Sequence, residues 1–83
     1  MEKPFIDNII IYPNPNSGNF TVDIGQVTDK IDVTVLDLQG RIVLRKGFTQ
    51  TYLFQMNLND RAGIYFVSIS SEHGKSLVKI IIE

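Results

Sequence analysis

The fold class follows from the stretch NFTVDI at residues 19–24. Phe20, Val22 and Ile24 alternate there with polar residues, so their side chains fall on one face of an extended chain. This two-residue period is typical of a half-buried β-strand, whereas a helix repeats its apolar residues every three or four positions. The whole chain agrees, because it holds twelve isoleucines and seven valines but a single alanine.

Six further segments of strand-like composition surround this stretch. Glycine, asparagine, aspartate and proline separate them at intervals of about 8 to 12 residues, a spacing typical of an antiparallel sandwich. The segments are residues 8–12, 31–38, 41–46, 52–58, 64–70 and 77–82. The sequence therefore predicts an all-β fold, an immunoglobulin-like antiparallel β-sandwich of about seven strands.

The connections between these segments are also readable. We expect loops at residues 25–30 and 47–51, and a hairpin closed by Gln39-Gly40. A β-bulge is expected near residues 36–38, where the parity of the apolar positions changes. Residues 64–70 begin apolar on both faces, which indicates a central strand.

The predicted core is made of the alternate residues whose side chains share the inward face of these strands. It consists of Phe20, Val22, Val33, Val35, Phe54, Tyr65, Val67 and Ile80. A chain of 83 residues buries only about 60% of the surface it exposes when unfolded, so it has room for one core. We expect a tail at residues 1–7 and one sandwich domain at residues 8–83.

Charge and composition exclude several classes of function. The formal net charge of −1 gives no field that would gather nucleic acid or an anionic membrane surface. The absence of cysteine excludes a disulfide scaffold and a thiolate metal site. The longest apolar run, residues 80–82, is far shorter than the roughly 18 residues that cross a bilayer. We expect no nucleic-acid partner and no membrane insertion, and the oligomeric state stays open.

Catalytic groups are sparse in this sequence. The single histidine, His73, lies in a polar turn and is expected to be a solvated loop residue. Asp23, Asp32 and Asp37 occupy outward or strand-end positions, where single acids usually serve solubility. We therefore expect no enzyme activity and no catalytic residues.

Two clusters of oxygen-bearing side chains resemble the loops that bind calcium. One holds Asn57, Asn59 and Asp60, and the other lies within residues 14–17. Neither has the spacing of an EF-hand loop, and turns in which the side chain bonds its own backbone explain both. The glycines are isolated, so no phosphate-binding loop is present. We expect no metal site and no cofactor.

Exposed aromatic residues leave one binding function open. Tyr12, Tyr52, Phe48 and Phe66 could form a platform for a sugar or a peptide, although aromatics in a small sandwich are more often core residues. A carbohydrate- or peptide-binding accessory module of a secreted enzyme is therefore the alternative function.

Four sequence blocks together resemble a known family. They are YPNP and GNF at residues 12–15 and 18–20, VLDLQGR at 35–41, GIYFV at 63–67 after Leu58, and KIII at 79–82. In this order and at these distances they resemble the C-terminal sorting domain, type A, of the bacterial type IX (Por) secretion system. The resemblance covers residues 9–83, nearly the whole chain.

The resemblance implies a function in recognition. It implies a C-terminal sorting signal of a secreted Bacteroidetes protein that passes through the periplasm to the outer membrane and cell surface. The expected partners are the type IX translocon with its shuttle components, a sortase-like peptidase that cuts ahead of Ile9, and a cargo domain N-terminal in the parent chain. We expect the parent to begin with a leader peptide and to end at residue 83.

The resemblance also assigns residues. It places the recognition signal at the end of the chain, with support from the strand before it: Lys79, Ile80, Ile81, Ile82, Glu83, Gly63 and Tyr65. Glu83 stands where members of the family often carry a basic residue. The structural motif positions are Pro13, Asn14, Pro15, Gly18, Asp37 and Gly40. A terminal edge strand can present its backbone to a partner by strand addition, which supplies a physical mechanism.

Overall fold

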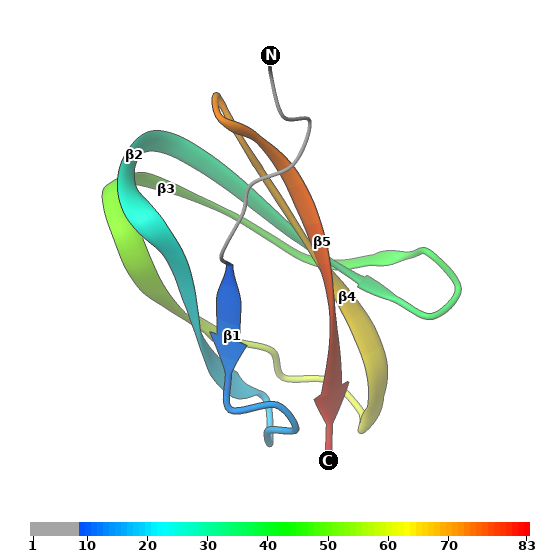
Figure 1. The fold of residues 1–83 in the computed structure, drawn as a ribbon. Coiled ribbons are helices and arrows are strands. Elements are labelled where there is room, and N and C mark those ends of the chain that lie inside the picture. Colours follow the sequence, from blue (N-terminus) through cyan, green and yellow to red (C-terminus); the bar gives the residue numbers. More distant parts are fainter. Residues whose placement is uncertain (1–8) are drawn as a thin grey trace.

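Antiparallel strands without a helix make up the computed structural model, which describes residues 9–83 (Figure 1). The strands are β1 (Ile10–Tyr12), β2 (Asn19–Asp37), β3 (Ile42–Asn57), β4 (Gly63–Ser71) and β5 (Gly74–Ile82). The all-β prediction is therefore confirmed. Within these residues, no helix is long and apolar enough to cross a membrane.

The two long strands build both layers of the fold. The first part of β2 pairs with β1 and with the last part of β3, while its second part pairs with the first part of β3 and with β4. β4 in turn pairs with β5. Figure 1 shows β2 and β3 bending together, and beyond the bend β2 lies beside β4, with which it pairs. One hydrogen-bonded sheet thus folds over and encloses its own apolar face.

The bend lies where the sequence predicts loops. The β2–β3 register shifts between Asp23 and Thr28. The buried positions of β2 have even residue numbers as far as Thr28 and odd numbers from Ile31 onward. Gly25 has a φ of 87° at this corner, and Gln50 on β3 has a φ of 49°. Both values lie in the left-handed region, which turns the chain sharply without ending the strand.

The predicted number of strands is wrong, because the structure has five rather than seven. The expected loops at residues 25–30 and 47–51 are strand, since Thr28 pairs with Thr51 and Lys30 pairs with Thr49. A loop and a bend that keeps its pairing both interrupt the alternation of apolar residues, so the sequence does not distinguish them. Most of each predicted segment nevertheless lies within one of the five strands. The expected tail at residues 1–7 and the first residue of the segment 8–12 lie outside the described residues.

Three other predictions concern the second layer, namely the hairpin, the bulge and the central strand, and all three are confirmed. Residues 38–41 connect β2 to β3, and a register irregularity between Val35 and Leu36 leaves Val43 as an extra residue on β3. β4 lies between β2 and β5, as its apolar faces predict.

The core fills the space between the layers. It consists of Ile11, Phe20, Val22, Ile24, Ile31, Val33, Val35, Phe54, Met56, Leu58, Tyr65, Val67, Ile69, Ile80 and Ile82. All eight predicted core residues belong to it. Ile80 and Ile82 are the contribution of the end of the chain, so the last strand is held to the rest of the fold by its inward side chains.

Replacing Phe20 with alanine tests this packing. The ring is 2% exposed, so Phe20→Ala is expected to lower the free energy of unfolding by roughly 3–5 kcal/mol. Urea unfolding measures the change, with Ile10→Ala at a residue that is 56% exposed as the control. An unchanged midpoint for Phe20→Ala would refute the placement of this ring in the core.

Candidate recognition site

The turn after β1 lies against the end of β5, although the two are more than sixty residues apart in the chain. Asn14 accepts a hydrogen bond at Oδ1 from the backbone N–H of Ile81 (2.9 Å). Its Nδ2 donates to the carbonyl of Lys79 (3.2 Å). One side chain thus imitates the backbone of a neighbouring strand, using the amide as acceptor and donor together.

Asn16 extends this pairing with its own backbone. Its N–H donates to the carbonyl of Ile81 (3.0 Å), and its carbonyl accepts from the N–H of Glu83 (2.8 Å). Its side chain stays within the turn, where Nδ2 donates to the Pro13 carbonyl (3.0 Å) and Oδ1 accepts from the Gly18 N–H (2.7 Å). We call Asn14 and Asn16 the asparagine clamp.

The clamp needs a sharply turned chain on either side. Both bonds that precede Pro13 and Pro15 are cis. Gly18 has a φ of 118°, and its carbonyl accepts from the N–H of Leu58 (2.7 Å). A Cβ at Gly18 would lie 2.6 Å from the Leu58 carbonyl oxygen, so only glycine fits this close approach.

The side chains of residues 79–83 alternate between the core and the outer surface. Ile80 and Ile82 are buried, whereas Lys79, Ile81 and Glu83 are exposed. The clamp holds the backbone of this segment from its open side, and β4 pairs with it on the other. The predicted signal residues therefore form one ordered strand end that shows three side chains to the outside.

Gly63 and Tyr65 lie next to this strand end on β4. Gly63 pairs with Ile82, and Tyr65 pairs with Ile80. The Tyr65 hydroxyl donates to the carbonyl of Arg61 (2.6 Å), a contact like the tyrosine corner of immunoglobulin-like sandwiches. Burial raises the pKa of this hydroxyl, and the nearby negative charges add to the effect. Tyr65 is 5% exposed and so supports the terminal strand from inside.

Asp37 and Gly40 form the hairpin between β2 and β3. The Asp37 Oδ1 accepts from the N–H groups of Gln39 and Arg41 (both 2.9 Å), and Oδ2 accepts from the Arg41 Nε (2.9 Å). The hydrogen bond from the Arg41 backbone is the main cause that lowers the pKa of this carboxyl below 3.8. Gly40, with a φ of 86°, donates its N–H to the Asp37 carbonyl. Asp37 and Gly40 thus both make hydrogen bonds within this turn.

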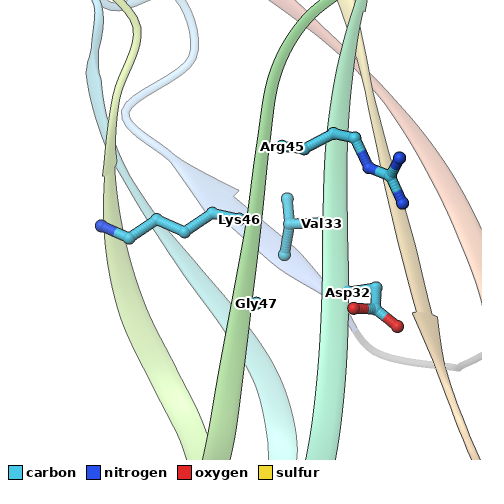
Figure 2. Close-up of a pocket in the computed structure, with 5 residues that line it drawn as sticks. All are labelled: Asp32, Val33, Arg45, Lys46 and Gly47. Carbon is cyan, nitrogen blue, oxygen red and sulfur yellow. The ribbon is translucent and has the colours of Figure 1, made fainter.

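The residues considered for catalysis do not gather. His73 lies in the β4–β5 turn, where its backbone N–H donates to the Ser71 hydroxyl. Asp23 accepts from the Gly25 N–H at the bend of β2. Asp32 lines a small cavity of about 150 Å³ together with Arg45 and Lys46, which project from opposite sides of β3 in Figure 2. This cavity brings no acid, base and nucleophile together.

The oxygen-bearing clusters are occupied by hydrogen bonds. The Asn14 amide is bonded to β5, and the Asn16 amide is bonded within the turn. Asn57 Nδ2 donates to Asn19 Oδ1, and Asp60 accepts from the Arg61 N–H. Among residues 9–83, no three His, Cys, Asp or Glu side chains are placed to hold a metal ion.

The aromatic residues lie on separate surfaces. Phe48 stacks on Phe54 with ring centroids 4.0 Å apart, against the core. Phe66 is half-buried on the outer face of β4. Tyr12 pairs with Thr21 at one end of β1, whereas Tyr52 follows Thr51 at the bend of β3. This distribution gives no support to a platform for sugar or peptide.

Sequence reasoning missed the partnership between the turn and the terminal strand. It assigned Asn14 to the turn and Lys79 to the signal but gave no contact between them. Asn16 was not among the expected site residues, yet it is 6% exposed and makes two backbone bonds to the last strand. The only signal in the sequence was a pair of asparagines alternating with prolines.

Comparisons with known proteins identify the family and the fold of the chain. The family model described as "Secretion system C-terminal sorting domain" matches residues 10–83. The crystal structure of a DUF3244 family protein from Bacteroides vulgatus ATCC 8482, which has an immunoglobulin-like β-sandwich fold, superimposes with a TM-score of 0.78. It is 16% identical, and the match covers 99% of this chain and 93% of that one. The predicted immunoglobulin-like sandwich is confirmed. A search of the curated proteins finds no match.

Removing the amide of Asn14 tests the clamp. Asn14→Ala deletes two solvent-accessible hydrogen bonds to β5 and is expected to lower the free energy of unfolding by about 1 kcal/mol. Urea unfolding measures it. Asn59→Ala, at an exposed turn residue, is the matched control and is expected to change little. Equal effects of the two substitutions would contradict the clamp.

The hairpin carboxylate predicts a pH dependence. Because the folded-state pKa of Asp37 is lowered, its contribution to stability is present above its ordinary value of 3.8 and is lost as the pH falls through the lower folded-state value. Thermal melts from neutral to acidic pH are expected to fall less steeply below pH 3.8 for Asp37→Asn than for the unchanged chain. Parallel curves would show that Asp37 carries no such linkage.

Proposed function

The chain belongs to the family of secretion-system C-terminal sorting domains, and we propose that the feature read by the machinery is the clamped end of β5. The domain is a C-terminal sorting signal for type IX secretion, so the protein that carries it is exported to the cell surface or secreted. The immunoglobulin-like fold is a non-catalytic scaffold for this signal. The recognition residues on it are Lys79, Ile80, Ile81, Ile82 and Glu83, with Gly63 and Tyr65 beneath them.

The alternation of buried and exposed side chains in this strand end supports the proposal. Ile80 and Ile82 are buried, so substituting them removes core packing as well as signal. Lys79, Ile81 and Glu83 are exposed and are the side chains that a receptor contacts. The clamp and β4 bond the backbone of this segment from both sides, so little conformational entropy remains to be lost on binding.

The position of the clamp argues against the strand-addition mechanism that the sequence suggests for the end of β5. Strand addition along the whole terminal strand conflicts with the hydrogen bonds that Asn14 and Asn16 already make from Lys79 to Glu83. Recognition of residues 79–83 then proceeds through their exposed side chains, as in the docking of two folded surfaces. The observation that carries the proposal is this closure of the edge while the side chains stay accessible.

The rest of the pathway is proposed from the family. The signal engages the translocon and its shuttle components after transit through the periplasm. A sortase-like peptidase cuts in or before the segment ahead of Ile9 and releases the cargo that precedes it. The domain is the substrate of that cleavage, and the catalytic residues belong to the peptidase.

An export assay tests the signal directly. A reporter with an N-terminal leader is fused ahead of the domain in a bacterium that has type IX secretion, and the reporter is measured in periplasm and medium. Ile81→Asp alters a side chain that is 39% exposed and is expected to lower export roughly tenfold, with accumulation in the periplasm.

A control variant and a stability measurement show whether the loss of export is specific to residue 81. Ile10→Asp places the same charge on the outer face of the other layer and is the matched control, with export expected to stay near the unchanged level. Thermal melts of the purified variants separate lost recognition from lost folding. Full export of a folded Ile81→Asp variant would overturn the proposal.

A further inference from the structure

Among residues 9–83, hydrogen bonds close the outer edge of β5 over only part of its length. The N–H and C=O groups of Ile81 both bond to the clamp, so they face away from β4. In an antiparallel strand, residues of the same parity direct both groups to the same side. The backbone N–H and C=O groups of Lys75 and Leu77, and the N–H of Lys79, therefore also face away from β4. Within residues 9–83, β5 pairs along its length with β4 alone.

The side chains beside this open stretch form a regular row. Lys75, Leu77 and Lys79 are all exposed, with Leu77 at 61%, and lie on the outer face of the layer. Their partners on β4 are Ser70, Ser68 and Phe66, none of which carries a charge. The open backbone edge is thus bordered by a basic, an apolar and a basic side chain, with a neutral strand behind them.

A second copy of this chain is a poor occupant of the edge. Antiparallel pairing of two copies centred on Leu77 would set Lys75 of each copy opposite Lys79 of the other. Like charges directly opposite each other destabilise a strand pair. Lysine on an edge is a known means of discouraging self-association. The same row attracts a strand with acidic residues at the corresponding positions.

We propose that residues 75–79 of β5 are a docking edge for an extended segment of a partner protein that carries acidic, apolar and acidic side chains at alternate positions. The segment adds to β5 as a further strand and bonds the outward N–H and C=O groups of Lys75 and Leu77 and the N–H of Lys79. Its acids lie beside the two lysines and its apolar residue beside Leu77. The inference rests on the proposed function, because it places this partner in the secretion machinery next to the clamped signal.

A peptide titration tests the chemistry of the edge. The probe is acetyl-Glu-Thr-Val-Thr-Glu-amide, added at low ionic strength to the ¹⁵N-labelled chain, with acetyl-Lys-Thr-Val-Thr-Lys-amide as the reversed-charge control. We expect the amide signals of Lys75, Leu77 and Lys79 to shift with the acidic peptide and not with the basic one. Absence of shifts, shifts centred elsewhere, or equal shifts with both peptides would overturn the proposal.

Three substitutions separate backbone pairing from charge. Leu77→Pro removes an N–H that makes no bond to β4 and is expected to weaken the acidic peptide roughly tenfold. Lys75→Glu is expected to weaken the acidic peptide by a similar factor and to favour the basic one. Lys30→Glu, at an exposed lysine near the bend of β2, is the matched control and is expected to bind as before. Unchanged binding by Lys75→Glu overturns the proposal even where Leu77→Pro does not fold.

The export assay distinguishes this inference from the proposed function. Lys75→Glu and Ile81→Asp are compared in the same reporter. Export lost in both supports both statements. Normal export of Lys75→Glu with retention of Ile81→Asp overturns the docking edge and leaves the signal standing. Normal export of Ile81→Asp overturns the proposed function, whatever the peptide titration shows.

Discussion

The backbone of a last strand has to be bonded on its outer side or stay open to any partner. In this protein Asn14 and Asn16 bond it from Lys79 onward, through contacts of 2.8–3.2 Å that join the two ends of the described chain. The rest of the turn follows from that requirement. Gly18 passes close to Leu58 to reach β2, and the side chain of Asn16 is used entirely to hold the turn in shape. The strand end is thereby ordered without being covered by a further strand.

The two long strands give this arrangement its rigidity. Because β2 and β3 pass through both layers, the layers are joined by continuous backbone pairing at the bend as well as by apolar contact. β4 and β5 are attached to the second half of β2, and Tyr65 links the start of β4 to the preceding loop. The inner side chains of the terminal strand, Ile80 and Ile82, complete the same core. The terminal strand and the rest of the sandwich therefore share one core.

Sequence reasoning reached the local features and missed the distant ones. Alternation placed Phe20, Val22 and the other core residues correctly, because each strand has one face to bury. It failed at residues 25–30, where a bulged bend and a loop leave the same pattern. It also could not place Asn14 beside Ile81, because a hydrogen bond between residues sixty-seven positions apart produces no repeating pattern in the sequence. The family resemblance supplied the importance of both segments, and the structure supplies the contact between them.

Amide hydrogen exchange at two residues of β5 measures the central claim most directly. Ile81 and Leu77 share a parity and both direct their N–H groups away from β4, but only Ile81 meets the clamp. After correction for intrinsic rates, the account predicts exchange at Ile81 at least roughly tenfold slower than at Leu77. Equal protection of the two amides, or faster exchange at Ile81, would contradict a strand that is closed at its end and open before it.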